Sequence, residues 1–385
     1  MANRSTVFSQ VLQYLPKVRF QEFVKQHRGD YRVRKLDCWT WFGALLFGQL
    51  TGHNSVRAIA RSFQCHRIGF KTLGFHRVRR STLAEANERR PTGILEATFY
   101  SLLSLAQHQA PKSKFRFKGP VWAMDSTTIS LCLELCPWAQ FHHDRGAFKL
   151  HTAIDVAGDL PQFALITKGR VHDIAAVRNM KFPAGTTLVI DRAYVDYAWL
   201  WKLTCSGVWF VTRMKKNCKH KVGKRRKTNR TQGVICDQTI QLNSQRGKDY
   251  AGDLRKVSYR DPDTGDRYTF LTNRFDLSAR TIAALYKARW QVELFFKNLK
   301  QHLRVKKFLG TSVQSVQAQI WVALIAYLLV SLIRWRERLN WSIPETMAVV
   351  GVMLLSRMLL ESLFREAPAQ RLAPPGIEQL TLWPV

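Results

Sequence analysis

Two short apolar segments of this 385-residue chain each contain one aspartate. Asp125 lies inside Val121–Ile129 and Asp191 ends Thr187–Asp191, and both segments have the residue types of buried strands. A carboxylate in a buried strand is costly unless a cation, a hydrogen-bond network or a metal ion compensates its charge. The chain must therefore fold so that a compensating group meets these acids, and structural pairing and metal binding both remain open at this point.

A helical pattern later in the chain carries a third acid, Glu293. Together with an aromatic residue and two cations it forms a stripe within roughly 60° on a helical wheel. The stripe consists of Tyr286, Arg289, Glu293 and Lys300, and Lys297 and Arg304 extend it. Apolar residues cluster beside the stripe, so it borders the core. A single helix of this kind can aim Glu293 into a cleft while its cations reach toward phosphate.

The periodicity changes along the chain from helical to strand-like and back. Residues 6–110 and those from Ser278 onward show helical periodicity, and the residues between them alternate as short strands do. Strands are expected at 121–130, 147–155, 162–167, 186–190, 208–212, 234–242, 255–259 and 268–272, helices at 174–180 and 194–203, and turns at Gly158–Asp159 and Asp261–Gly265. We also expect Ser81 to cap a helix that follows a basic run.

The charge of the chain indicates a polyanionic partner. Sixty Lys and Arg residues against 27 Asp and Glu give a formal net charge of +33, a self-repelling surplus that points to nucleic acid. The basic run of Lys224, Arg225, Arg226 and Lys227 is interpreted as a solvated loop that contacts DNA.

Membrane association and zinc binding are not favoured. The apolar run Ile320–Ile333 is short for a bilayer span and is interpreted as a buried core helix, and Met1–Ser9 lacks the apolar stretch of a signal peptide. A cytoplasmic protein with reduced thiols is expected. The spacing of the remaining zinc candidates lacks paired short knuckles; these candidates are Cys205, Cys218, His220 and Cys236.

Two histidine-containing segments are interpreted conservatively. The trio His142, His143 and Asp144 is expected to form a surface loop. The pair His172-Asp173 lies at an expected helix start, where Asp173 can act as the cap, and a supporting role behind the acids is left unassigned.

The spacing Tyr286-x2-Arg289-x3-Glu293-x6-Lys300 resembles the Y-R-E-K signature of bacterial DDE transposases of insertion sequence family 4. The resemblance covers most of the chain. Asp125-Ser-Thr-Thr and Asp191-Arg-Ala-Tyr resemble the two aspartate motifs of the family, Gly169–Asp173 resembles the segment between them, and Arg80–Arg89 is similar to part of the N-terminal domain of many members.

The resemblance implies an α/β fold with an RNase H-like catalytic core and a β-rich insertion between the second Asp and the Glu. The expected domains are a helical N-terminal DNA-binding domain (1–115), the first part of the core (116–212), the basic insertion (213–277), the second part of the core (278–335) and a C-terminal helical region with an irregular tail (336–385).

The resemblance also implies the chemistry. Asp125, Asp191 and Glu293 would hold two Mg²⁺ or Mn²⁺ ions, with Asp125 as the shared ligand. Arg289 and Lys300 would bind phosphates. Tyr286 would contact a phosphate or the terminal nucleotide, and the expected mechanism is cut-and-paste transposition through a hairpin.

The expected partners are the double-stranded DNA of terminal inverted repeats and target, with two copies of the chain in the synaptic complex. A catalytically silent DNA-binding relative and a nuclease without strand transfer are the alternatives.

Overall fold

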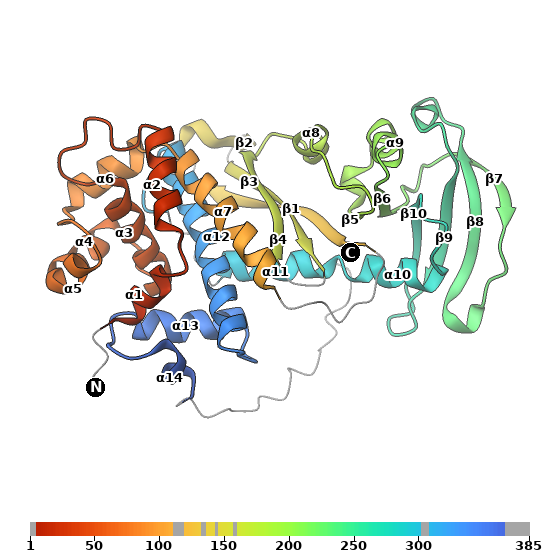
Figure 1. Ribbon diagram of the computed structural model, residues 1–385. Helices are drawn as coiled ribbons and strands as arrows, with labels where there is room; N and C mark the ends of the chain where they lie inside the picture. The colour runs from red at the N-terminus through yellow and green to blue at the C-terminus, as the bar shows by residue number, and fades with distance from the viewer. Residues whose placement is uncertain are drawn as a thin grey trace. The chain divides into compact units, whose positions relative to one another are not determined.

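The computed structural model describes residues 5–110, 119–131, 136–142, 145–156, 160–301 and 308–365. The chain divides into two compact units. The helical unit consists of Met1–Pro111, Thr128–Lys149 and Phe295–Pro368, and the sheet unit consists of Lys112–Thr127, Leu150–Leu294 and Ala369–Val385. Figure 1 shows the helices of the first unit and the sheet of the second.

The helical unit is built around two helices that are apolar on all sides. Its elements are α1 (Val7–Leu12), α2 (Lys17–Gln26), α3 (Cys38–Thr51), α4 (Val56–Cys65), α5 (Arg67–Thr72), α6 (Arg80–Arg89), α7 (Gly93–Gln109), η1 (Pro137–Ala139), β2 (Gln140–His142), α12 (Val313–Arg336), α13 (Ile343–Met353) and α14 (Leu360–Arg365). Every residue of α3 from Cys38 to Leu50 is buried, and so is every residue of α12 from Ala318 to Ile333. Helices that are apolar all round belong in a protein core or a membrane.

The expected core helix at 320–333 is therefore part of α12. By length and composition α12 is the one helix of the described chain that could cross a membrane, but 94% of its apolar window is buried inside the protein.

The expected cap at Ser81 is wrong. Helix α6 begins at Arg80, with Arg79 at the N-cap and no side-chain cap hydrogen bond. Val78 and Leu83, on either side of this start, are both buried.

The sheet unit carries most of the strands. They are β1 (Val121–Leu131), β3 (Arg145–Asp155), β4 (Leu160–Lys168), β5 (Thr187–Ile190), β6 (Trp209–Arg213), β7 (His220–Arg225), β8 (Val234–Leu242), β9 (Leu254–Arg260) and β10 (Arg267–Thr272). Strands β1 and β3 each have one end in the helical unit. The order is β3-β1-β5-β6-β10-β9-β8-β7, with β4 beside β3. Strand β5 pairs in parallel with β1 on one side and with β6 on the other. From β6 onward, through β10, β9 and β8 to β7, each strand pairs antiparallel with the next.

Five of these strands lie side by side in the order β4-β3-β1-β5-β6. If the five are numbered 1 to 5 along the chain, this spatial order is 3-2-1-4-5, the arrangement of the RNase H-like core that the family resemblance implies. The β-rich segment that follows β6 extends the same sheet. The other elements are α8 (Asp173–Val177), η2 (Arg192–Tyr194), α9 (Tyr197–Cys205), η3 (Arg230–Gln232), η4 (Arg246–Asp249), α10 (Ala279–Lys287) and α11 (Trp290–Gln301), the last of which continues into the helical unit.

The two faces of the central strands are covered by different helices. Helix α9 lies on one side of β5 and β6 and α10 on the other (Figure 1). Met124, Leu188 and Ile190 point into the core that contains the α9 residues Trp199 and Leu200. Because side chains alternate along a strand, Val189 on β5 and the residues that follow Met124 and Ile190 face α10.

Two strands, β2 and β7, were not expected from the sequence. Strand β7 carries Lys224 and Arg225, so the interpretation of the basic run as a loop is wrong for its first half. The strand forms because its backbone pairs with β8, although its side chains are almost all exposed. The expected turn at Gly158–Asp159 lies outside the described residues.

A buried ion pair fixes the start of α10. The Arg255 guanidinium donates to both carboxylate oxygens of Asp237, at 2.9 and 2.7 Å, and the two side chains are 3% and 6% exposed. Arg255 Nη1 also donates to the Leu277 carbonyl at 2.6 Å, immediately before the Ser278 N-cap of α10. The insertion strands β8 and β9 thus hold the helix that leads to Glu293.

Replacing Asp237→Ala leaves the Arg255 charge buried without its partner. We expect a loss of about 3–5 kcal/mol of unfolding free energy, the usual cost of breaking a buried pair. Urea denaturation measures it. Lys287→Ala is the control, because Lys287 and Asp263 form a half-exposed pair at 3.4 Å whose removal should cost less than about 1 kcal/mol. Equal losses in the two variants would contradict this role for Asp237.

Candidate active site

The two strand aspartates lie side by side. Strands β1 and β5 pair in parallel with Met124 opposite Ile190, so the next residue on each strand is an aspartate, Asp125 and Asp191. Since Met124 and Ile190 point into the core with α9, both aspartates face the side of the sheet that α10 covers. The register alone therefore places two carboxylates together.

The segment that carries Glu293 is not the single helix that the sequence predicted. Helix α10 ends at Lys287 and α11 begins at Trp290. Between them the bonding tightens: Arg289 N–H donates to the Tyr286 carbonyl and Val292 N–H to the Arg289 carbonyl, both at 3.1 Å and three residues apart. Arg289 lies in this turn, and Glu293 follows it by four residues, a spacing at which helical side chains meet.

Arg289 links two of the three acids. Its Nη1 donates to Asp125 Oδ2 at 2.6 Å and its Nη2 to Glu293 Oε1 at 2.5 Å. The Arg289 side chain is 12% exposed, against 22% for Asp125 and 32% for Glu293. Charge-assisted bonds of this length in a partly buried site are strong. Arg289 is thus the cation that compensates these carboxylates in the structure.

The carboxylates share one electrostatic environment. Burial raises the pKa of Asp125 to about 6, the Arg289 guanidinium and the Ser126 backbone N–H oppose that rise, and the negative charges of Asp191 and Glu293 add to it. Each acid therefore makes ionisation of Asp125 harder. The positive charge of Arg289 favours the ionised form of Asp125.

Tyr286 lies behind Asp191. Its side chain is buried, its hydroxyl donates to Asp191 Oδ1 at 3.4 Å, and its ring is 5.1 Å from that of Phe270. Burial is the main cause that raises the pKa of Tyr286, so the phenol is neutral and remains a donor. In the structure its hydroxyl is directed toward the carboxylate.

The other cations that were expected to bind DNA lie on and after two elements, α11 and β7, or outside the described residues. Lys297 is exposed and Lys300 half-buried on α11, whereas Arg304 lies outside the described residues. On and after β7, Lys224, Arg225 and Lys227 are exposed. Arg226 is half-buried and pairs with Asp237 at 3.2 Å, which gives it a structural role that the sequence did not reveal.

Other sequence candidates do not assemble. Within the described residues, no group of three or more His, Cys, Asp or Glu side chains is arranged as a ready cation site. This holds for Cys205, Cys218, His220 and Cys236, and also for the three acids, two of which are bound to Arg289. His143 and Asp144 lie outside the described residues. Asp173 does not cap α8: His172 is the N-cap and makes no side-chain cap bond, and Asp173 instead accepts a hydrogen bond from Ser126 Oγ at 2.8 Å.

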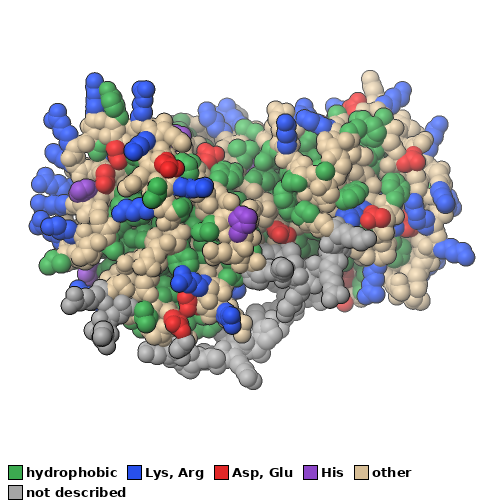
Figure 2. Space-filling view, viewed as in Figure 1, with side chains coloured by type: hydrophobic (Ala, Val, Ile, Leu, Met, Phe, Trp, Pro, Cys, Tyr) green, Lys and Arg blue, Asp and Glu red, His purple; other side chains and the backbone are tan. Residues whose placement is uncertain are grey.

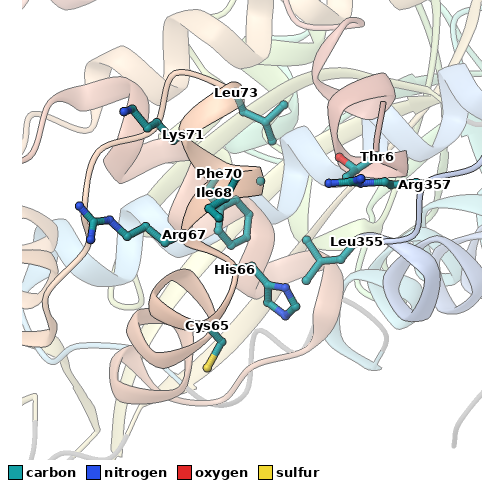
Figure 3. A pocket seen from close by; sticks show the side chains of 11 residues that line it. Thr6, Cys65, His66, Arg67, Ile68, Phe70, Lys71, Leu73, Leu355 and Arg357 are labelled. Carbon is teal, nitrogen blue, oxygen red and sulfur yellow. The ribbon is translucent and has the colours of Figure 1, made fainter. Parts of the chain in front are cut away.

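Positive charge also lines a cavity in the helical unit. The cavity, of about 790 Å³, is formed by α5, its flanking residues, Thr6 before α1 and the segment after α13, and none of the described residues that line it carries a carboxylate. Arg357 lies across it from Arg67 and Lys71 (Figure 3). Figure 2 shows Lys and Arg side chains gathered over the helices at one end of the view and over β7 and β8 at the other.

Comparison with known proteins gives consistent matches. Residues 116–329 match the family model described as a transposase DDE domain, and residues 3–76 match one described as a domain of unknown function. The chain is 35% identical over 262 residues to a protein of Sinorhizobium fredii named as a transposase, y4zB, with 67% of this chain and 71% of that protein covered.

A second relative comes from Geobacillus stearothermophilus and is named as the transposase for insertion sequence element IS5377. It is 33% identical over 264 residues, which cover 68% of each chain. Among solved structures, a piggyBac transposase synaptic complex with hairpin DNA matches with a TM-score of 0.43 and 12% identity, covering 95% of this chain and 81% of that one.

Replacing Arg289→Ala removes the cation shared by Asp125 and Glu293. In metal-free buffer at pH 7.5 we expect a loss of about 2 kcal/mol of unfolding free energy, because two partly buried carboxylates lose a charged donor. The loss should shrink as the pH falls to 5. Without Arg289 the folded-state pKa of Asp125 lies further above its value in the unfolded chain, so the folded variant takes up a proton that the unfolded chain does not.

Denaturation in EDTA at the two pH values measures this effect. Arg289→Lys, which keeps the charge without the fork, should lie between wild type and Arg289→Ala. A cost for Arg289→Ala that is the same at both pH values would contradict the charge compensation.

Proposed function

Because the chain belongs to the family of DDE transposases, we propose that it cuts and joins the ends of an insertion sequence at the site of Asp125, Asp191 and Glu293. One observation carries this assignment. Two adjacent strands place Asp125 beside Asp191 on one face of the sheet, and Arg289 binds Asp125 and, at the start of α11, Glu293.

The donor set fits the divalent metal ions on which the family depends. All three ligands are carboxylates, which supply the hard oxygen atoms that Mg²⁺ and Mn²⁺ prefer. The bond of Asp125 to Arg289, together with the burial that raises the pKa of Asp125, supports a need for positive charge at the cluster. We assign Asp125, Asp191 and Glu293 as the residues that would hold two such ions, with Asp125 shared. When bound, the ions would activate the attacking oxygen and stabilise charge on the phosphate.

The protein's own residues would orient the reaction. Tyr286 donates to Asp191 and would keep that carboxylate turned to the site. Arg289 would exchange its carboxylate partners for a DNA phosphate once other cations balance the acids, since a guanidinium fork matches phosphate oxygens. Lys297 and Lys300 follow Glu293 by four and seven residues on α11 and would bind phosphates along the same helix face. Arg304, outside the described residues, is proposed as a further phosphate contact.

The exposed cations support binding to double-stranded DNA. Lys224, Arg225 and Lys227 are exposed on and after β7, where no further strand of the described sheet pairs. With the partly tied Arg226 they would contact the phosphate backbone. We also assign the helical segment 1–115 a DNA-binding role, supported by the cavity beside Arg67, Lys71 and Arg357.

The proposed reaction is cut-and-paste transposition by a cytoplasmic protein. The element end would be nicked, released through a hairpin, and joined by its 3′-hydroxyl to target DNA. Two terminal inverted repeats must be held together, so we propose that two copies of the chain act in the synaptic complex.

Incubating the protein with terminal-repeat DNA, target DNA and Mg²⁺ tests this function. Wild type should yield joined products, and Asp125→Ala, Asp191→Ala and Glu293→Ala should each lower cleavage by at least about 10³-fold, because each removes a ligand needed for charge stabilisation. DNA binding should persist in all three variants.

Asp263→Ala serves as a control, because Asp263 forms an exposed pair with Lys287. Cleavage without joining would identify a nuclease, and binding without cleavage a silent relative. Full cleavage by any of the three Ala variants would show that the site is assigned wrongly.

A further inference from the structure

A polar layer lies on the opposite face of the sheet from the three acids. Ser126 follows Asp125 on β1, so its side chain points the other way, toward α8. There Ser126 Oγ donates to Asp173 Oδ1 at 2.8 Å, while the Ser126 backbone N–H donates to Asp125 Oδ1, also at 2.8 Å. One residue therefore joins Asp125 to Asp173 through its two donors.

A fully buried histidine lies behind Asp173. His151 Nδ1 is 3.8 Å from Asp173 Oδ1, and its Nε2 shares a hydrogen bond with Thr167 Oγ1 at 2.9 Å. His151 and Thr167 come from the adjacent strands β3 and β4. The Asp173 side chain is only 19% exposed, so these neighbours restrict its orientation.

The layer also reaches the second aspartate motif. Tyr194 belongs to the segment Asp191-Arg-Ala-Tyr and is fully buried. Burial is the main cause that raises the pKa of Tyr194, and the charges of Asp125 and Asp173 add to the rise. The segment Gly169–Asp173, which carried no function in the sequence, is thus connected to Asp125 through Ser126.

We propose that Asp173 is a positioning residue: through the Ser126 hydroxyl it fixes the part of β1 that presents Asp125, and so sets the orientation of that carboxylate for metal binding. This inference rests on the proposed function. Helix capping does not account for Asp173, because its side chain is turned to Ser126. Direct ligation does not account for it either, because the Ser126 side chain that it holds points away from the face of Arg289 and Glu293.

Mn²⁺ binding to the full-length protein, followed by electron paramagnetic resonance, tests the proposal alongside cleavage. Asp173→Ala should weaken Mn²⁺ binding and slow cleavage by about 10–100-fold, the usual effect of losing a residue that orients a ligand. Asp173→Asn keeps an acceptor oxygen for Ser126 Oγ and should stay within about 3-fold of wild type. Ser126→Ala should match Asp173→Ala, and the double variant should be no worse than either single one.

A second hydrogen-bonded pair of the same kind provides the control. Ser342 Oγ donates to Glu345 Oε2 at 2.7 Å in the capping box of α13, in the helical unit. Ser342→Ala and Glu345→Ala should leave Mn²⁺ binding unchanged. If Asp173→Ala does not fold, the near-isosteric pair Ser126→Ala and Asp173→Asn still decides the matter.

Three results would overturn the positioning role. They are an Asn variant as impaired as the Ala variant, a Ser126→Ala protein that binds Mn²⁺ like wild type, and additive losses in the double variant. Failure of the proposed function is distinguishable from these, because Asp125→Ala would then leave Mn²⁺ binding intact.

Discussion

Buried negative charge must be balanced, and at Asp125, within β1, the Arg289 guanidinium balances it. The parallel register of β1 and β5 brings Asp125 and Asp191 together whether or not their charges are compensated. Glu293 adds a third acid from α11. Arg289 contacts two of these acids from the turn between α10 and α11, and the Arg255 contact with the Leu277 carbonyl holds the start of α10.

The strand β1 works through both of its faces. On one face Asp125 meets Arg289 and the other acids, and on the opposite face Ser126 meets Asp173 and the histidine behind it. Because consecutive side chains of a strand point in opposite directions, a contact on one face constrains the orientation of a group on the other. A change in the polar layer is therefore transmitted to the carboxylate without contact with DNA.

The sequence predicted what depends on local pattern. Apolar strands around Asp125 and Asp191 were found because their residues are buried, and α12 because it is apolar throughout. Strand β7 was missed because its side chains are basic and exposed, and only pairing with β8 makes it a strand. The break at Ala288 and Arg289 was missed because a helical wheel records side-chain directions and not a local change from four-residue to three-residue hydrogen bonding.

The link between Ser126 and Asp173 was beyond sequence reasoning for a different reason. The two residues are 47 positions apart, and although both lie in segments that resemble family motifs, nothing in those segments pairs one with the other. From its local context alone Asp173 was interpreted as a helix cap. In the structure its carboxylate accepts a hydrogen bond from the Ser126 hydroxyl instead. Contacts of this kind depend on the tertiary arrangement of β1 and α8.

Anomalous diffraction from crystals grown with terminal-repeat DNA and Mn²⁺ tests most directly whether the three acids hold the metal ions. We expect Mn²⁺ bound by Asp125, Asp191 and Glu293, with the Arg289 guanidinium moved from the carboxylates to a DNA phosphate. Mn²⁺ bound elsewhere in the protein, or Arg289 still paired with Asp125 and Glu293 while DNA occupies the site, would contradict it.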